Sequence, residues 1–439
     1  MRKLSFIFNN LSDSIKKVLG NTGWLISDKI IRMAIGLFVA AWVARYLGPD
    51  QYGLLNFSLA LVALVGVLSN LGLQELIIRN IVKDPEKRDD LLGTAFVIKA
   101  VGGILVFIFS ILITFLIRPD DLTSHVLVII IAAGPIFQSF DVIEFYFKSQ
   151  VKAKYSVIAK SISFLVINVL KVVLIILEAP LIAFAFAVTA DILLGSASLV
   201  AAYKLSGKFI RKWKMNLAQA KEFLAEGYLL GISAIAVLIY MRIDQIMIGQ
   251  LLGDKEVGLY SAAVKLSEVW YVIPLALIQS VAPVLVKSYN ENIHKYNYRL
   301  QKLFNLLTLI GLVIAVPTIF LSGWIVEIVF GGAYSNSSGI FAIHIWSIIF
   351  VGWGLLRNHI LVFEKLVYIT MIASLCGAAA NVIINYFLIP LYKGEGAAIA
   401  TLLSQLISSS IVLLFFSKSR KLVWMELKSL FRFYDIKPE

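Results

Sequence analysis

The stretch Leu47-Gly48-Pro49-Asp50-Gln51-Tyr52-Gly53-Leu54 lies between two long apolar runs of the sequence. The first run, residues 24–44, carries charged residues in its first half, and the second begins at Leu54. Glycine and proline next to aspartate are typical of a tight turn, so the stretch predicts a hairpin between two hydrophobic helices. A related stretch, Leu252-Gly253-Asp254-Lys255-Glu256-Val257-Gly258-Leu259, follows 205 positions later. The chain is therefore predicted to use one helical unit twice.

The composition of the chain is that of a membrane protein. Of its 439 residues, 59% are apolar and only 15% are charged, against roughly 25% charged residues in soluble domains. Its apolar runs of about 20 residues are each long enough to cross a hydrocarbon core of about 30 Å. The sequence therefore predicts an all-α polytopic membrane protein with twelve transmembrane helices, near residues 22–44, 54–73, 92–117, 123–147, 156–177, 181–203, 227–249, 257–285, 303–322, 339–356, 366–389 and 396–416.

The net charge of +13 reports membrane topology. Lysine and arginine residues outside the predicted spans gather on the side that holds the N-terminus, and the opposite side carries only Arg45, Arg118, Lys255 and Lys393. Because basic loops stay in the cytoplasm, both termini are predicted to be cytoplasmic. This distribution accounts for the basic excess, so no nucleic-acid partner is expected.

The spans and the repeat predict five parts of the chain. Two six-helix lobes, 22–203 and 222–416, are joined by a basic cytoplasmic linker, 204–221. Residues 1–21 are expected to form an amphipathic helix on the anionic inner leaflet, and residues 417–439 a cytoplasmic amphipathic tail. Because each half holds an even number of helices, an axis along the membrane normal would relate the halves, an arrangement that usually encloses a central cavity with alternating access.

Several classes of chemistry are excluded by what the sequence lacks. Its one cysteine, Cys376, permits neither an internal disulfide nor a multi-cysteine metal site, and its four histidines have no ligand spacing. It contains no P-loop, no nucleotide-binding glycine motif and no Ser/His/Asp arrangement. The chain is therefore expected to be a transporter rather than an enzyme, with no metal and no cofactor, and to draw energy from an ion gradient or the membrane potential.

Two groups of residues carry a family resemblance. The first is Arg45-Tyr-Leu-Gly-Pro-Asp-Gln-Tyr-Gly-Leu-Leu-Asn-Phe-Ser, followed by Asn70-Leu-Gly-Leu and Arg79. The second is Arg242-Ile-Asp-Gln-Ile-Met-Ile-Gly-Gln-Leu-Leu-Gly, followed by Val257-Gly-Leu-Tyr-Ser-Ala-Ala. In these residues, and in length and helix number over essentially the whole chain, the sequence resembles the bacterial polysaccharide flippases, which are the O-antigen and exopolysaccharide exporters of the MATE-like MOP transporter superfamily.

The resemblance implies a fold and a substrate. The fold would have a V-shaped central cavity between the two six-helix lobes. The substrate would be an undecaprenyl-pyrophosphate-linked oligosaccharide repeat unit, moved from the cytoplasmic to the outer leaflet of the bacterial inner membrane. The polysaccharide polymerase and the glycosyltransferases of the same pathway would be partners, together with membrane lipids and a coupling ion, either H+ or Na+.

Charged residues inside the predicted spans are the candidate site residues. A charge at the bilayer centre costs roughly 2.5–3.5 kcal/mol on insertion scales and usually faces a cavity or an opposite charge. The basic candidates for contact with pyrophosphate or sugar are Lys29, Arg32, Lys99, Lys171, Arg242 and Lys265. The acidic candidates for ion coupling are Asp28, Asp141, Asp191 and Asp244.

Spacing leaves two interpretations of the first charges open. Asp28 and Arg32 are four residues apart, so they can neutralise each other along one helix face and simply allow the helix to insert. Alternatively, Arg32 faces the cavity together with Lys29, where its planar guanidinium suits a bidentate contact with phosphate oxygens.

The charges of the second half raise the same choice. Lys265 and Glu268 are three residues apart, which favours a pair along one helix. Arg242 and Asp244 lie two residues apart on different faces, so each is expected to find its partner on another helix. Lys171 has no opposite charge within one turn and either snorkels outward or contributes to the site.

Two other functions remain open on the sequence. The same fold could carry a MATE-type drug or cation antiporter, although a carboxylate-dominated cavity would suit that function better than this mixture of charges. In a different class, an integral membrane polysaccharide polymerase or glycosyltransferase would need a catalytic external loop or a cytosolic domain. The external loops predicted here are short, which argues against that class.

Overall fold

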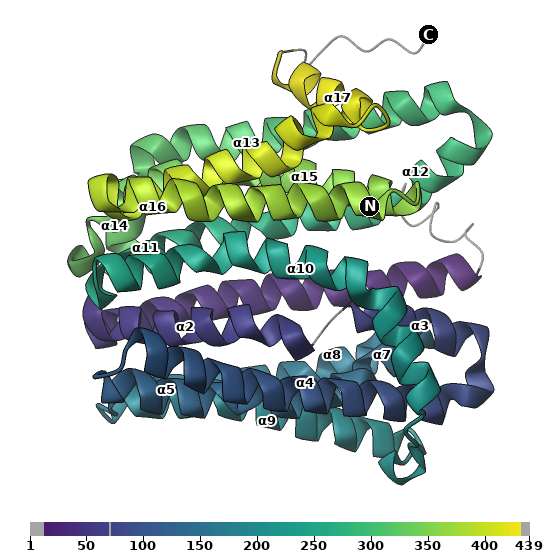
Figure 1. The fold of residues 1–439 in the computed structure, drawn as a ribbon, viewed down its shortest axis with the longest axis horizontal. Helices are drawn as coiled ribbons and strands as arrows, with labels where there is room; N and C mark the ends of the chain where they lie inside the picture. The colour runs from purple at the N-terminus through teal and green to yellow at the C-terminus, as the bar shows by residue number, and fades with distance from the viewer. Residues whose placement is uncertain (1–12, 70–71, 432–439) are drawn as a thin grey trace, which may run out of the picture. The chain divides into compact units, whose positions relative to one another are not determined.

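The structure, a computed structural model, describes residues 13–69 and 72–431, with side chains described from Ile31 onward except at 229–230. Every regular element in these ranges is a helix (Figure 1). The α-helices are α2 (Asp13–Val65), α3 (Leu73–Lys83), α4 (Arg88–Ile117), α5 (Leu122–Ala132), α6 (Gly134–Phe137), α7 (Val142–Ser149), α8 (Ala153–Ile176), α9 (Leu181–Leu205), α10 (Leu217–Leu251), α11 (Asp254–Glu268), α12 (Val272–Glu291), α13 (Ile293–Phe330), α14 (Ser337–His344), α15 (Ser347–Phe363), α16 (Val367–Leu406) and α17 (Arg420–Phe431). Short 3₁₀ turns are η1 (Gly66–Ser69), η2 (Pro85–Lys87), η3 (Gln138–Asp141), η4 (Ile210–Lys212), η5 (Val269–Tyr271), η6 (Gly332–Tyr334) and η8 (Val412–Phe415), and η7 (Ile407–Ile411) is a π-helical turn.

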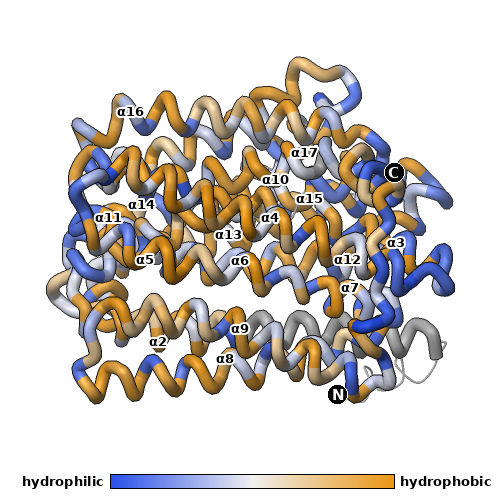
Figure 2. Tube along the Cα trace, turned by 60° about the horizontal axis from the view of Figure 1, so that its bottom comes forward, coloured by the Kyte–Doolittle hydropathy of each residue, from blue (hydrophilic) through white to orange (hydrophobic). Residues whose placement is uncertain are grey.

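Ten helical segments among the described residues are long and apolar enough to cross a membrane. Two of them contain a residue with non-helical backbone angles, Gly48 in α2 and Lys393 in α16, at loops that the sequence predicts between two spans. The all-α membrane fold is thereby confirmed, while the count of twelve spans and the cytoplasmic location of both termini stay predictions. Figure 2 shows apolar residues along the long helices and hydrophilic residues near helix ends, as around α3.

The irregular points of the backbone recur in the two halves of the chain. The residues with positive φ include three pairs separated by 205, 214 and 215 positions: Gly48 with Gly253, Val151 with Lys365, and Glu178 with Lys393. The interruptions recur as well, since η1 corresponds to η5, and η3 corresponds to the turn at 345–346 between α14 and α15. The predicted duplication of the scaffold is thus visible in backbone geometry.

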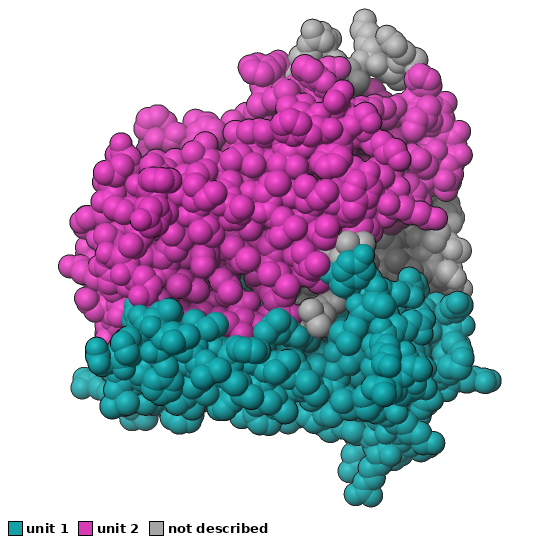
Figure 3. All heavy atoms as spheres, in the orientation of Figure 1, with its two compact units in different colours: residues 1–39, 68–228 teal, residues 40–67, 229–439 magenta. Residues whose placement is uncertain are grey.

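By its internal contacts the chain forms two compact units, each of which is discontinuous in sequence (Figure 3). Unit 1 comprises Met1–Val39 and Leu68–Tyr228, and unit 2 comprises Ala40–Val67 and Leu229–Glu439. The hairpin turn at Gly48 therefore belongs to unit 2. The lobe and linker boundaries expected from the sequence stay predictions, and the expected surface helix 1–21 falls largely outside the described residues.

Unit 1 is built on the packing of α4 against α5 and α6, and of α8 along α9. Its apolar core includes Ile77 and Leu92, both fully buried. Gly103 lets α4 approach the start of α6 closely, because a Cβ atom there would lie 2.7 Å from the Cα atom of Ile136. This close contact holds α4 beside the helix interruption that forms the candidate site.

In unit 2, α15 packs against α13 and α16, and α17 packs against α13 (Figure 1). The core of this unit includes Phe304, Trp353 and Leu356, together with Val423 from α17. The sequence predicts an amphipathic tail helix, and the described residues contain one at Arg420–Phe431. The buried face of this helix packs on α13 and the apolar core of unit 2.

The turn at Gly48 and its repeat at Gly253 lie against each other within unit 2. A Cβ atom on Gly53 would lie 1.7 Å from the carbonyl oxygen of Asp254, and a Cβ atom on Gly258 would lie 2.0 Å from that of Pro49. Only glycine allows the backbones to come this close. Because the four residues correspond through the same offset of 205, the contact is symmetric in the repeat.

Two further contacts hold the part of α2 just before the Gly48 kink within unit 2. The guanidinium Nε of Arg45 donates to the carbonyl of Val329 at the end of α13, at 3.0 Å. The hydroxyl of Tyr334 donates to the carbonyl of Ala44 at 2.8 Å. A cation at the C-terminus of a helix satisfies carbonyls that lack partners in the helix and interacts favourably with its dipole.

Candidate functional site

The fourth predicted span is interrupted inside unit 1, where α5 gives way to α6, η3 and α7. Pro135 lies at the start of α6, and proline cannot donate a backbone hydrogen bond. Hydroxyl groups of α9 compensate: Thr189 donates to the carbonyl of Ile130 and Ser196 to that of Phe137, each at 2.8 Å. Irregular backbone at membrane depth is tolerated where it is buried in protein or lines a cavity.

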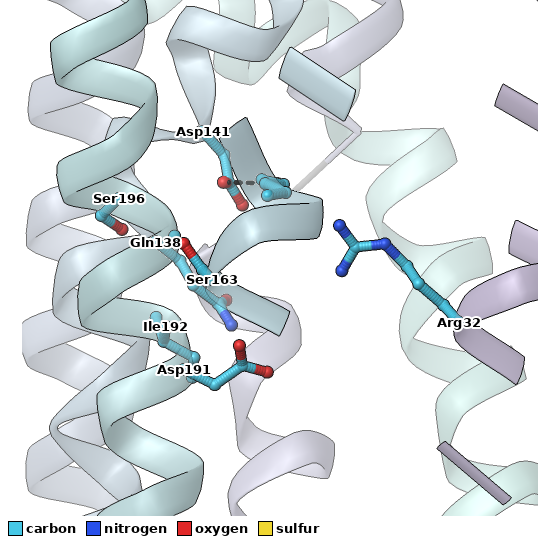
Figure 4. A pocket seen from close by; sticks show the side chains of 9 residues that line it. Arg32, Gln138, Asp141, Ser163, Asp191, Ile192 and Ser196 are labelled. Carbon is cyan, nitrogen blue, oxygen red and sulfur yellow. Dashed lines mark ion pairs between the residues drawn. The ribbon is translucent and has the colours of Figure 1, made fainter. Parts of the chain in front are cut away.

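A polar cavity of about 160 Å³ lies beside this interruption (Figure 4). Its lining comes from α2, η3, α8 and α9: Arg32, Gln138, Asp141, Lys160, Ser163, Asp191, Ile192, Gly195 and Ser196. Arg32 points from α2 toward the other labelled side chains (Figure 4). Its Nη2 atom lies 3.4 Å from the hydroxyl of Ser161, and its guanidinium carbon lies 5.0 Å from the ring centre of Phe164, both on α8.

A lysine-centred network closes one side of the cavity. The ammonium of Lys160 lies 2.8 Å from a carboxylate oxygen of Asp141 and 2.5 Å from one of Glu144. Glu144 also pairs with Lys148, at 2.6 Å. Asp141 is therefore already neutralised by a basic partner, which leaves it less suited to ion coupling than an acidic side chain without a close ion pair.

Asp191 is the second carboxylate of the cavity. It lies within electrostatic range of Lys171, Arg32 and Lys160, so three basic side chains share its field. The structure thus brings three of the candidates, Arg32, Asp141 and Asp191, to one cavity, and Lys171 of α8 interacts electrostatically with Asp191. Two basic and two acidic side chains line the cavity itself, which makes it mixed in charge.

Three other candidates of the first half are not placed at this cavity by the described side chains. Lys99 on α4 is only 2% exposed, and its ammonium lies 5.8 Å from the ring centre of Phe145. Asp28 and Lys29 belong to α2, but their side chains fall outside the described part of the structure. A role for these three residues stays a prediction.

In unit 2, Arg242 on α10 pairs with Glu268 on α11, at 3.5 Å. The expectation that Arg242 binds a residue of another helix is confirmed. Lys265 interacts electrostatically with Glu268, while the ion pair found for Glu268 among the described residues is the one with Arg242, so the pairing of Lys265 with Glu268 stays a prediction. Both Arg242 and Glu268 are partly exposed and so accessible to a ligand.

Asp244, two residues further along α10, faces the interior of unit 2. It is 2% exposed, and its two carboxylate oxygens accept three hydrogen bonds. Asn385 Nδ2 donates to Oδ1 at 2.5 Å, while the hydroxyls of Tyr260 and Thr401 donate to Oδ2 at 2.6 and 2.5 Å. The expectation of partners on other helices holds here too, since the donors come from α11 and α16.

The polar cluster around Asp244 extends along α16. The amide of Asn385 lies 3.1 Å from Asn381 Oδ1, and Asn381 Nδ2 donates to the hydroxyl of Ser404 at 3.3 Å. The remaining amide oxygen, Asn385 Oδ1, is buried without a hydrogen-bond partner among the described residues. A carboxylate beside an unpartnered amide oxygen offers the oxygen donors that hard cations prefer.

Sequence reasoning missed several residues of these two clusters. Lys160 and Glu144 lie near predicted span ends, where basic and acidic residues are ordinary, and nothing in their spacing separates them from loop charges. Asn381 and Asn385 carried a usable signal, because two amides four residues apart form one polar face on an otherwise apolar helix. Tyr260 and Thr401 carried none.

Comparison with known proteins agrees with this architecture. A family model described as "Polysaccharide biosynthesis protein" matches residues 18–289, and one described as "MatE" matches residues 230–387. A protein of Escherichia coli (strain K12) named "Putative O-antigen transporter" is 21% identical over 403 residues, which cover 88% of this chain and 94% of that protein.

Solved structures share the fold at low sequence identity. An inward-facing multidrug resistance MATE family transporter of the MOP superfamily superposes with a TM-score of 0.71 at 16% identity, covering 91% of this chain and 94% of that one. The lipid II flippase MurJ in an inward closed conformation gives 0.71 at 16% identity, covering 93% and 91%. The resemblance noted in the sequence is confirmed. Because the first family model spans more than half of its length, the chain belongs to the polysaccharide biosynthesis protein family, and it has the fold of MOP-superfamily transporters.

Proposed function

We propose that this chain is a flippase, not an enzyme, that moves undecaprenyl-pyrophosphate-linked oligosaccharide repeat units from the cytoplasmic to the outer leaflet of the bacterial inner membrane. The observation that carries the proposal is Arg32, an arginine inside an apolar span that points into a polar cavity beside an interrupted helix. A guanidinium inside a membrane span is costly to insert and is usually retained for function. Family membership supports the same conclusion.

Arg32 would meet the pyrophosphate. At about 1.5 Å per residue, it lies about 12 Å along the helix from Trp24, which is near the cytoplasmic end of its predicted span, and so close to the middle of the membrane. Its fork-shaped guanidinium matches two phosphate oxygens at once. The cavity of about 160 Å³ is smaller than the roughly 300–1,000 Å³ of pockets that enclose a drug-sized ligand, so it would take one headgroup portion of a large substrate rather than the whole.

The remaining basic candidates would extend this contact. Lys171 interacts electrostatically with Asp191, which lines the same cavity, and Lys29 precedes Arg32 on the same helix. In unit 2, Arg242 and Lys265 offer a second basic pair beside Glu268. Hydroxyl and amide groups such as Gln138, Ser163 and Ser196 suit sugar hydroxyls, which need both donors and acceptors.

Loss of the chain is expected to strand lipid-linked repeat units on the cytoplasmic face while their synthesis continues. The measurement is the amount of undecaprenyl-linked repeat unit, and its accessibility from each side of the membrane, in a clean deletion strain. Restoration by the full chain on a plasmid is the control. Normal surface polysaccharide in a deletion strain without a second flippase would contradict the proposed function.

A MATE-type cation antiporter is the second candidate. The MatE match over residues 230–387 and the two carboxylates in the unit 1 cavity favour it. Against it, Asp141 is bonded to Lys160, so only Asp191 remains for a cationic substrate, and Arg32 would repel one. Reconstituted protein that extrudes an organic cation such as ethidium, and does not translocate lipid-linked sugar, would favour this candidate over the flippase.

Energy coupling is assigned in this proposal to Asp244 rather than to Asp28, Asp141 or Asp191. A carboxylate removed from water needs hydrogen bonds, a proton or a cation to offset its lost hydration. Asp244 has three hydrogen-bond donors and lies beside the unpartnered oxygen of Asn385, so it would hold a proton or Na+ that leaves during the transport cycle.

Asp244→Asn is expected to remove the response of transport to an ion gradient, because the amide keeps the shape but neither binds a proton nor attracts a cation. The measurement is translocation in vesicles with and without an imposed H+ or Na+ gradient, and the ratio of the two rates should fall to one. Asp120→Asn, the same change at an exposed position, should leave the ratio at the wild-type value. An unchanged ratio in Asp244→Asn would exclude Asp244 as the coupling residue.

A further inference from the structure

Glu426 on α17 is a carboxyl group buried inside unit 2. Its side chain is 0% exposed, whereas Trp424 on the same helix is 59% exposed. The hydroxyl of Ser410 donates to Oε2 at 2.9 Å, and Oε1 has no hydrogen-bond partner among the described residues. One neutral donor returns much less free energy than a buried carboxylate loses with its hydration.

Arg357 on α15 is a buried cation whose charge acts on Glu426. It is 3% exposed, and it interacts electrostatically with Glu426 and Tyr240. Its hydrogen bonds go elsewhere: Nη1 donates to the carbonyl of Ser408 at 2.6 Å, and Nη2 donates to Asn358 Oδ1 at 3.0 Å. Within the described residues, no ion pair joins Arg357 to Glu426.

Both charged groups contact the same irregular turn. The π-helical turn η7 follows α16 and contains Ser408 and Ser410, both buried. Arg357 bonds to its backbone and Glu426 to one of its side chains. Single π-turns inside helices are energetically costly insertions that occur frequently at functional sites. The turn therefore contacts a buried arginine and a buried carboxyl group that are not joined by an ion pair among the described residues.

The surroundings of Glu426 favour its neutral form. The α13 residues that bond to α17 are uncharged: Gln301 donates to the carbonyl of Met425, and Thr308 shares a hydrogen bond with Ser429. Other titratable or charged groups of α13 and α17 include Tyr296, Arg299, Lys302, Arg420, Lys421 and Lys428, but the groups that act on Glu426 are Arg357 and Ser410. Burial raises the pKa of Glu426 to about 8, although Arg357 and Ser410 oppose the rise.

We propose that Glu426 is a proton-binding site that locks α17 onto the π-turn of α16, and that loss of its proton draws Arg357 from the Ser408 carbonyl to the Glu426 carboxylate. The proton passes to water, and the new ion pair replaces the hydrogen bond between Arg357 and Ser408. Two bonding arrangements of one arginine make the turn a two-state element that proton concentration biases.

Because η7 directly follows α16, a change in this turn would reach the polar residues of α16 around Asp244. Ser404, one turn earlier on α16, bonds to Asn381, and Thr401 bonds to Asp244. A change in η7 would alter the position of these groups around Asp244. The link to transport rests on the proposed function, whereas the bonding switch itself does not.

The test uses the full chain with one fluorescent label on α17. Cys376 is replaced by serine, Trp424 is replaced by cysteine, and that cysteine is labelled with an environment-sensitive dye. We expect a reversible change in emission between pH 7 and 9 with a midpoint near 8, because Glu426 releases its proton in that range. This readout needs no transport, so it can fail or succeed independently of the flippase assignment.

Three substitutions decide the origin of the change. Glu426→Gln should abolish it and keep the low-pH emission at every pH. Arg357→Gln should move the midpoint to higher pH, because the ionised carboxylate loses the cation that stabilises it, and this variant decides the matter if Glu426→Gln is not recovered folded. Glu364→Gln, a matched change in a half-buried carboxyl near Lys421, should leave the midpoint in place. No pH response in the labelled protein, or a midpoint that neither Glu426→Gln nor Arg357→Gln alters, would overturn the proposal.

Discussion

Replacing Arg32 with alanine is expected to abolish export while the protein still accumulates in the membrane. The cavity would lose the one lining side chain that can hold two phosphate oxygens in a planar fork, and Asp191 would lose one of the three basic side chains that offset its charge toward an anionic headgroup. The measurement is surface polysaccharide in a complemented deletion strain, with membrane abundance determined in parallel. Lys287→Ala, which removes one positive charge at an exposed position, is the matched control and should complement fully.

Two additional variants separate binding from simple charge neutralisation. If Arg32 only neutralises Asp191, then Arg32→Ala combined with Asp191→Asn should restore export. If Arg32 binds the headgroup, the double variant should stay inactive, and Arg32→Lys should retain export at about one tenth of the wild-type rate, which corresponds to the loss of one hydrogen bond of about 1.4 kcal/mol. Full complementation by Arg32→Ala would remove Arg32 from the proposed site.

The sequence predicted the scaffold better than the packing within it. Apolar length located the spans, and the glycine-containing turn at Gly48 and its repeat at Gly253 mark positive-φ residues in the structure. The turn at Ile345–Trp346, in contrast, contains neither glycine nor proline, so the local sequence did not predict a helix interruption there. Its counterpart near Pro135 in the first half was the only available indication, and that inference requires knowing how the repeats align.

For the candidate site, the sequence likewise identified residues but not their contacts. Arg32, Asp141 and Asp191 were identifiable because a charge within an apolar run is conspicuous by its insertion cost. Their geometry was not, because the partners of Asp244 lie up to 157 positions away in the chain and a single sequence carries no information on such contacts. The charge pairs differ between the halves although the helix interruptions match, so the scaffold is duplicated and the chemistry is not.

The second large effect is expected at Gly53 and Gly258, where the turn at Gly48 meets its repeat. Either glycine replaced by alanine would place a Cβ atom at 1.7 or 2.0 Å from a backbone carbonyl oxygen, which forces two helices apart rather than one side chain aside. Overpacking typically lowers the free energy of unfolding by about 1–3 kcal/mol. Because the clash here is with backbone atoms, which cannot rotate away, we expect these variants to lose at least the upper value of that range. The expected result is a clear fall in melting temperature of the detergent-solubilised protein and in the amount recovered as a monodisperse peak.

Gly323→Ala is the matched control for that experiment, because nothing lies within 4 Å of a Cβ atom at this position of α13. Alanine has the higher helix propensity, so this variant should equal or exceed the wild type in stability. The double variant Gly53→Ala with Gly258→Ala should cost less than the sum of the single changes, since one separation of the helices relieves both overlaps. Strict additivity, or a wild-type melting temperature in either single variant, would mean that the two turns do not meet as described and that the repeat is not joined to itself at this point.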